Sequence, residues 1–179
     1  MTSEIIIGNV CSLCALASDS IAGTRKKTDQ ILGIQIISQF FYAAGSIVLK
    51  GYSSTAQNAA AVLRNLAAMK RIKSKAIEWS LIALGVVLGI VLNNRGLLGF
   101  LPIVANLEYS IAVFRFKDNE KLLKIALIVN LIMFSAFSLV ISNYVGVAAN
   151  LVVAAATFIS MIKTARAKKK GGAEKTAEE

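Results

Sequence analysis

One short pattern occurs twice in the chain and restricts its fold more than any other feature. Residues 20–27 read SIAGTRKK and residues 110–117 read SIAVFRFK, which share Ser-Ile-Ala-x-x-Arg-x-Lys. Further on, Tyr52 and Asn58 recur 92 residues later as Tyr144 and Asn150. Each copy of the pattern closes one apolar run and precedes two more. Self-similarity at a fixed spacing indicates a duplicated structural unit, so we expect two copies of a three-helix unit.

The composition places these units in a membrane. The chain is 56% hydrophobic and 17% charged, with a mean hydropathy of +0.65, whereas soluble domains carry about 25% charged residues. It has 20 basic and 10 acidic residues, and the basic ones are confined to short segments between apolar runs. That arrangement is typical of the loops of a membrane protein rather than of a nucleic-acid-binding surface. We therefore expect the lipid bilayer as a partner and no nucleic acid.

Seven apolar runs are long enough to be membrane spans, since a spanning helix needs about 17–25 residues. The third run is the least apolar because it carries residues such as Gln57 and Arg64, and its correspondence with the last run identifies it as a helix. The tail, residues 163–179, lacks an apolar period and is predicted to be disordered. The expected spans are residues 5–22, 31–49, 53–69, 76–92, 97–114, 122–141 and 144–162.

The basic residues predict the topology. Only Lys50 and Arg95 lie on one side of the seven spans, and sixteen basic residues lie on the other. Positive charge collects on the cytoplasmic side, so the amino terminus is expected outside and the carboxyl terminus in the cytoplasm. The sixteen are Arg25, Lys26, Lys27, Lys70, Arg71, Lys73, Lys75, Arg115, Lys117, Lys121, Lys124, Lys163, Arg166, Lys168, Lys169 and Lys170.

The distribution of basic residues also explains why a fourth helix lies between the two copies. Three helices reverse the direction of the chain, yet both copies of the pattern must face the cytoplasm, so one extra crossing is needed between them. The expected fold is all-α: a first three-helix bundle over residues 5–69, a linker helix over 76–92 and a parallel second bundle over 96–162. This is a 3+1+3 arrangement.

Three charged residues are predicted to lie in one layer of the membrane. Asp19, Arg64 and Glu108 each precede a basic cluster by six or seven residues, which places them roughly 9–10 Å inside the cytoplasmic boundary. One interpretation is a cytoplasmic gate whose salt bridges form and break, with a spare carboxylate for a cation or proton. The other is a fixed ion pair that holds helices together while the third charge extends towards the interface.

A second set of polar side chains is predicted deeper in the membrane. Gln39 corresponds to Asn130 at a spacing of 91, and Asn58 to Asn150 at 92. Uncharged donors and acceptors from both repeats suit a neutral or zwitterionic polar solute, although amides also join helices without binding anything. The candidate substrate-binding residues are Gln35, Gln39, Tyr42, Asn58, Asn106, Tyr109, Asn130 and Asn150.

Catalytic and metal chemistry is not indicated. The chain has no histidine, and its two cysteines, Cys11 and Cys14, lie in an apolar run with no second pair elsewhere. A structural zinc site needs about four ligands, and no nucleophile and base are arranged as in a catalytic site. We expect no cofactor, no metal and no enzymatic activity.

Several stretches resemble the YgjV family of small bacterial inner-membrane proteins. That family is similar to the group of SWEET, PQ-loop and nicotinamide riboside transporters, in which a linker helix joins paired three-helix bundles. The resemblance implies an inner-membrane location, the 3+1+3 plan and solute translocation between the bundles. The stretches are RKK at 25–27, FF at 40–41, LKGY at 49–52, AVLR at 61–64, GFLPIVA at 99–105 and FR at 114–115.

Two departures from that group concern the substrate. Sugar-transporting SWEETs have a proline in the first helix of each repeat, but Pro102 is the single proline here, and no Pro-Gln pair occurs. A sugar is therefore not supported. The leading hypothesis is a transporter of a small polar solute that works by alternating access. The alternative is a membrane scaffold, accessory subunit or sensor that transports nothing. A monomer could form the whole path, and a homodimer is also compatible with the repeats.

Overall fold

The computed structural model describes residues 2–23, 28–70, 72, 74–116 and 119–177. In these residues the chain is all-α, as predicted, and contains no strand. Its elements are α1 (Ser3–Gly23), α2 (Thr28–Val48), α3 (Tyr52–Met69), α4 (Lys75–Val91), the short 3-10 helix η1 (Gly96–Phe100), α5 (Leu101–Arg115), α6 (Glu120–Val140) and α7 (Tyr144–Ala177). Most of the first copy of the repeated pattern, and Arg71, Lys73 and Lys117, lie outside the described residues or have no described side chain.

Two elements differ from their predicted limits. The fifth apolar run begins as η1, and α5 starts at Leu101 with Pro102 in its first turn, where a missing backbone N–H costs nothing. α7 ends at Ala177, whereas the sequence predicted that the helix ends at residue 162 and that disorder follows. The tail is rich in alanine, lysine and glutamate, which all have high helix propensity, and contains no proline.

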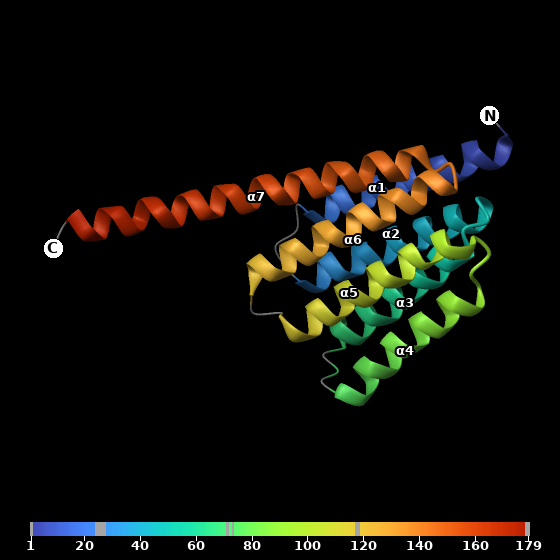
Figure 1. Ribbon diagram of the computed structural model, residues 1–179, viewed down its shortest axis with the longest axis horizontal. Coiled ribbons are helices and arrows are strands. Elements are labelled where there is room, and N and C mark those ends of the chain that lie inside the picture. The colour runs from blue at the N-terminus through green and yellow to red at the C-terminus, as the bar shows by residue number, and fades with distance from the viewer. Residues whose placement is uncertain (1, 24–27, 71, 73, 117–118, 178–179) are drawn as a thin grey trace.

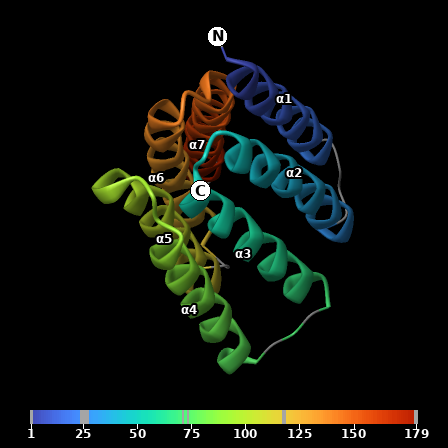
Figure 2. The ribbon, with the colours of Figure 1, turned by 90° about the vertical axis from the view of Figure 1, so that its right-hand side faces the viewer.

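The helices are arranged as two rows of three with α4 beside them (Figure 2). In one row α2 packs between α1 and α3, and in the other α6 packs between α5 and α7. The rows meet where α1 contacts α7 and where α3 contacts α5, and α4 packs against α3 and α5. Because α1 and α3 of the first repeat correspond to α5 and α7 of the second, these two contacts are equivalent under the repeat.

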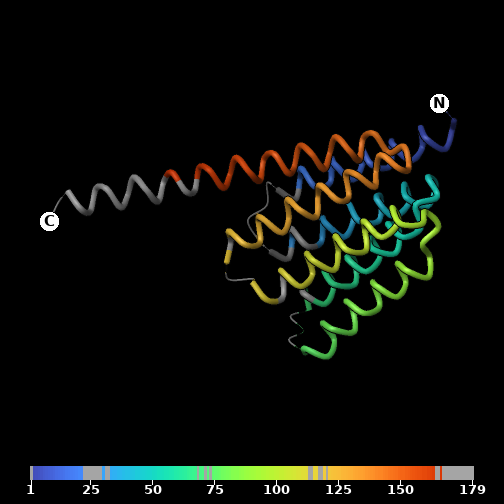
Figure 3. Tube along the Cα trace, in the orientation of Figure 1, coloured from blue at the N-terminus to red at the C-terminus, as the bar shows by residue number. Residues whose placement is uncertain are grey.

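The chain crosses back and forth along the rows, so the connections gather at two ends (Figures 1 and 3). The amino terminus, the α2–α3 turn, the α4–η1 connection and the α6–α7 turn share one end, here called the N-terminal end. Lys50 and Arg95, the two basic residues that the sequence separates from the rest, both belong to it.

The two tight turns at the N-terminal end have the same backbone geometry. Lys50 and Ser142, which are 92 residues apart, have φ angles of 56° and 58°. In both turns the amide of this residue bonds the carbonyl three residues back, and the next amide bonds the carbonyl five residues back. This left-handed residue with its paired bonds is a common way to end a helix. The duplication seen in the sequence therefore recurs in the backbone.

The distribution of side chains is the reverse of that in a soluble protein. Large apolar side chains such as Phe40, Val91 and Leu97 are 64%, 72% and 88% exposed. Among the described residues, nine of the thirteen buried hydrophobic ones are alanines, so this interior is made mainly of small residues. The buried polar residues are Asn9, Ser12, Ser38, Ser46, Ser53, Ser54, Gln57, Asn58, Asn65, Ser110, Ser135, Ser138 and Asn143. An apolar surface over a small and polar interior is expected of helices packed in lipid.

Three described helices are long and apolar enough to cross a membrane: Ser3–Ile21, Lys121–Val140 and Tyr144–Lys163. Two shorter apolar helical segments, Gly33–Val48 and Gly96–Ala112, accompany them. The full set of seven crossings stays a prediction of the sequence.

Candidate functional site

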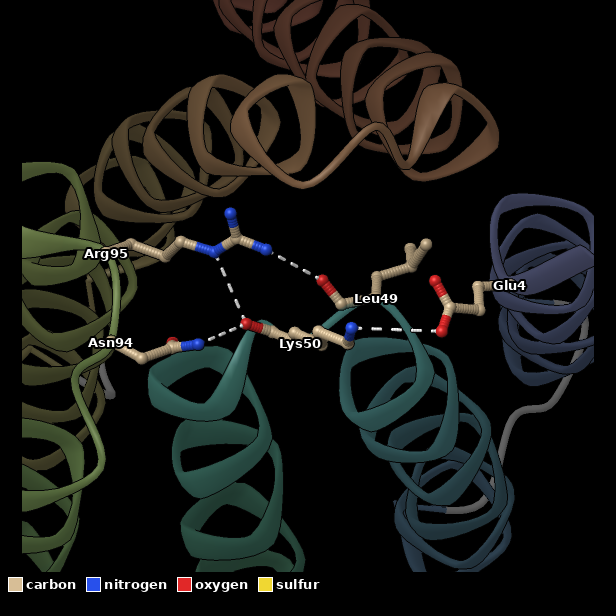
Figure 4. A network of polar contacts seen from close by, with 5 residues as sticks. All are labelled: Glu4, Leu49, Lys50, Asn94 and Arg95. Atoms are coloured by element: carbon tan, nitrogen blue, oxygen red, sulfur yellow. Dashed lines mark hydrogen bonds and ion pairs between the residues drawn. The ribbon is translucent and has the colours of Figure 1, made fainter. Parts of the chain in front are cut away.

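Polar contacts close the N-terminal end on the α4 side (Figure 4). Arg95 donates from Nη2 to the Leu49 carbonyl at 3.1 Å and from Nε to the Lys50 carbonyl at 3.3 Å. Asn94 donates to the same Lys50 carbonyl at 2.7 Å. The Lys50 ammonium lies 3.8 Å from Glu4, but both side chains are 60% exposed, so this ion pair contributes little. The segment before η1 is thus tied to the α2–α3 turn.

Asn9 makes the equivalent connection on the other side. Its Nδ2 donates to the Ser142 carbonyl at 3.1 Å, and its Oδ1 accepts from the Val145 amide at 2.8 Å. Ser142 corresponds to Lys50, so in each repeat the carbonyl of the left-handed residue accepts a hydrogen bond from outside its own repeat. The first helix of one repeat is joined in this way to the α6–α7 turn of the other.

A small cluster of apolar side chains, here called the plug, lies among these turns. It is formed by Leu49, Phe137 and Ile141, which are 6%, 1% and 4% exposed, with Ile5 and Leu101 packed against it. Leu49 and Ile141 occupy corresponding positions, one in each repeat. A Cβ atom at Gly51 would lie 3.1 Å from Ile141, so the turn passes close to α6. Both repeats therefore contribute to the closure of this end.

A chain of polar side chains connects α3, α4 and α5. Gln57 of α3 donates to the Gly85 carbonyl of α4 at 2.8 Å and accepts from Asn106 Nδ2 at 2.8 Å. Asn106 in turn accepts from Arg64 Nη1 at 3.3 Å, and the same Nη1 lies 3.2 Å from Ser110 Oγ. The orientation of each amide follows from its neighbours, because every bond in the chain has a defined donor and acceptor.

Arg64 borders a cavity of about 10 Å³ between α3, α4 and α5. This volume is close to that needed for one water molecule. The Cζ atom of Arg64 also lies 5.4 Å from the centre of the Tyr109 ring, within range of a cation–π contact. Apolar side chains of α4, Leu81 among them, form the rest of the lining.

The three charges predicted to pair do not meet. Arg64 faces Asn106 and Ser110, and in the described residues it forms no ion pair. The Asp19 carboxylate faces Ser38 and Tyr42 across the α1–α2 contact. Glu108 lies in an open, mainly apolar groove of about 460 Å³ between α5 and α6, and its Oε2 has no hydrogen-bond partner among the described residues. The predicted salt bridges are absent from the described residues because the three side chains occupy different helix contacts. Their common depth in the membrane stays a prediction.

The uncharged candidates fall into two groups. Asn106, Tyr109 and Tyr42 contact charged residues, and Asn130 donates to the Ala105 carbonyl at 2.8 Å, which joins α6 to α5. The Gln39–Asn130 correspondence therefore does not bring those two side chains together. In the described part of the chain, the remaining four side-chain amides make no hydrogen bond; they are the half-buried Gln35, Gln39 and Asn150 and the buried Asn58.

Sequence reasoning missed Asn9, Gln57 and Ser110 as site residues. Gln57 and Asn106 do not correspond in the repeat, so a search for symmetric pairs could not join them. Asn9 was hidden because its partners are backbone groups, which carry no sequence signal. The one indication that the sequence offered for Asn9 and Gln57 was an amide side chain within a predicted membrane span.

An apolar exterior around a small, polar interior of packed helices defines a polytopic α-helical membrane protein. The chain belongs to Imp-YgjV, a family of bacterial inner membrane proteins, whose pattern it matches over residues 6–168. No curated protein and no solved structure matches the chain.

Proposed function

We propose that this protein moves a small polar solute across the bacterial inner membrane by alternating access between its two three-helix units. In this proposal α4 is the linker of a 3+1+3 plan, as in the SWEET and PQ-loop group that the sequence resembles. The solute passes between the rows α1–α2–α3 and α5–α6–α7, and no enzymatic step is involved.

The reciprocal closure of the N-terminal end is the observation that carries this proposal. The bonds of Asn9 and of Arg95 reach from one half of the molecule to the equivalent turn of the other. The plug residues Leu49 and Phe137 likewise come from opposite repeats. A rocking motion of one repeat against the other would separate all of these contacts together, as alternating access requires.

The charges support an orientation for this state. Lys50 and Arg95 are at the closed N-terminal end, and described basic residues such as Lys70, Arg115 and Lys121 belong to the connections at the other end. Positive charge favours the cytoplasm, so the closed end is proposed to face outwards. The state described here would then be closed to the outside, with the amino terminus outside.

Side-chain amides that have no partner support a polar solute. Gln39, Asn58 and Asn150 make no hydrogen bond within the described chain, so the donors and acceptors of their amides are available to a polar molecule. A solute or water molecules in the path would satisfy these groups. Asn58 and Asn150 correspond in the repeat, as expected for residues that line a path on a symmetry axis.

A second function is favoured by one observation. α7 extends past its apolar segment Tyr144–Lys163 and carries the exposed Lys163 and Arg166. Basic residues that follow a membrane span bind anionic lipid headgroups or acidic partners. A scaffold or sensor would use this end and would need no path through the bundle.

Cysteine accessibility separates the two functions. Cys11 and Cys14 are replaced by serine, and single cysteines are placed at Asn58 and Asn150. A membrane-impermeant maleimide is then applied to right-side-out and inverted vesicles. A transporter in this state predicts labelling of both sites from the cytoplasmic side and slow labelling from outside. The control Val87→Cys, at a 55% exposed apolar position inside α4, should stay unlabelled in the bilayer. Protection of Asn58→Cys and Asn150→Cys from both sides would exclude the transporter.

A further inference from the structure

We propose that Arg64 and Ser110, with the guanidinium positioned by Asn106, form a binding site for a monovalent anion between α3 and α5. This inference rests on the proposed function for the source of the anion, which would be the carboxylate of the solute, while a free halide is the other source. The anion-binding chemistry itself requires only the contacts described above.

Within the described residues, the positive charge of Arg64 has no counter-ion. Its partners there are neutral: Asn106 Oδ1 at 3.3 Å, Ser110 Oγ at 3.2 Å and the face of Tyr109 at 5.4 Å. Charged side chains inside a membrane are normally paired with an opposite charge, because an uncompensated charge in a low dielectric is strongly unfavourable. Arg64 therefore differs from an ordinary structural ion pair.

The guanidinium also has unused donors. Both hydrogen bonds start from Nη1, whereas an arginine has five N–H groups in a planar fork suited to a carboxylate. Arg64 and Ser110 both line the cavity of about 10 Å³. It has room for a particle of the size of water, and separation of α3 from α5 would enlarge it for chloride or a carboxylate.

The neighbouring amides hold the site in place. Asn106 Nδ2 is engaged by Gln57 at 2.8 Å, and Gln57 is anchored to the Gly85 carbonyl at 2.8 Å. The Asn106 carbonyl oxygen must then point at Arg64, which fixes the guanidinium. α3 belongs to the first repeat and α5 to the second, so an anion on Arg64 would lie at the contact that a rocking motion changes. Anion binding and the motion would be coupled.

A purely structural role for Arg64 is the competing explanation. In that case the arginine only joins α3 to α5 through its bonds to Asn106 and Ser110, and no anion affects it. The two explanations differ in how stability depends on the anion, which can be measured on the whole protein.

The test is the thermal unfolding midpoint of the full-length protein in detergent. Sodium chloride and sodium acetate are titrated against sodium sulfate of equal ionic strength, and neutral acetamide is the control for acetate. We expect the midpoint to rise saturably with chloride or acetate in the wild-type protein and in Arg115→Gln, which changes an exposed arginine at the end of α5. Arg64→Gln should raise the half-saturating concentration at least tenfold.

A second variant keeps the test decisive if Arg64→Gln folds poorly. Asn106→Asp is isosteric and would place a carboxylate beside Arg64, so it should abolish the anion response while the protein stays folded without added anion. A response to chloride alone identifies a free inorganic ion, and a response to acetate but not acetamide identifies a carboxylate.

The proposal is overturned if the wild-type protein shows no saturable anion response, or if Arg64→Gln and Asn106→Asp respond as the wild type does. Neither result bears on cysteine accessibility. A protein whose path is labelled but which binds no anion would therefore lose this inference and keep the proposed transport function.

Discussion

At the scale of single residues, Asn9 joins the two repeats with more direct bonds than any other side chain of α1. Its amide donates to the carbonyls of Ile5 and Ser142 and accepts from the Val145 amide. These bonds use both N–H groups of the amide and one of the two lone pairs of its oxygen. Its contribution can be measured because the partners on α7 are backbone groups, which mutation leaves in place.

Asn9→Ala should destabilise the folded protein by about 1–3 kcal/mol, because it leaves the Val145 N–H and the Ser142 carbonyl without their partner. Thermal unfolding in detergent measures this. Ser20→Ala removes a hydroxyl that bonds only within its own exposed helix turn and should change the stability much less. Equal effects of the two substitutions would show that the α1–α7 connection is not important for stability.

Positions along a helix can be predicted from the sequence for the three charged residues, but their contacts cannot. The helical rise gives the depth of Asp19, Arg64 and Glu108, but not the direction in which each side chain points. That direction depends on which neighbours each helix packs against, and α3 faces α5 with Arg64 while α5 turns Glu108 towards α6. Such azimuths follow from tertiary packing and could not be read from a single sequence.

At the scale of elements, the apolar runs and the repeat predicted all seven α-helices, including the weakly apolar α3. The repeat succeeded because the two units share their turns as well as their helices. It could not predict how α4 packs, since α4 has no counterpart. That contact depends on Gly85 and Gly89 facing Ala60 and Gln57.

Because Gly89 of α4 packs closely against α3 and α5, its replacement by alanine should cost more stability than the same replacement at the open position Gly33. In Gly89→Ala the new Cβ would overlap Gln57 and lie 2.7 Å from Ile103, so α4 must move away and stability should fall by about 1–3 kcal/mol. Gly33→Ala is the matched control, because its nearest neighbour is a flexible methionine methyl at 4.0 Å. It should be neutral or stabilising by up to about 1 kcal/mol. A stable Gly89→Ala protein would contradict the packing described for α4.

Because Lys50 and Ser142 both have left-handed backbone conformations, replacing either with glycine should raise the stability of the protein by a similar amount. Lys50→Gly and Ser142→Gly should each stabilise the protein by about 0.5–1 kcal/mol, because glycine adopts positive φ without the steric cost of a side chain. Denaturation midpoints of the two variants give the comparison. Ser80→Gly, in the exposed side of α4, should instead cost roughly 0.5 kcal/mol. A loss of stability at either turn would argue against the shared geometry.

At the scale of the whole molecule, the sequence predicted the number of helices and the gathering of basic residues at one end. It did not predict that α1 would contact α7 as α3 contacts α5, nor that the N-terminal end would be closed by carbonyl contacts between the halves. Backbone carbonyls are the same in every residue, so the closure leaves little trace in the sequence beyond Asn9 and Arg95.

The central claim is that the two repeats move against each other, and it can be tested without knowledge of the solute. Spin labels are attached in pairs to a protein without native cysteines in nanodiscs, at Tyr52 and Tyr144 for the N-terminal end and at Lys70 and Lys163 for the other. All four positions are exposed. Double electron–electron resonance then gives the distance distribution for each pair.

Alternating access predicts two distances for each pair, with the populations shifted in opposite directions when Asn9→Ala weakens the closed end. The N-terminal pair should gain its longer distance while the opposite pair gains its shorter one. A single narrow distance at both ends, unchanged by Asn9→Ala, would contradict the transport mechanism and favour a rigid membrane scaffold.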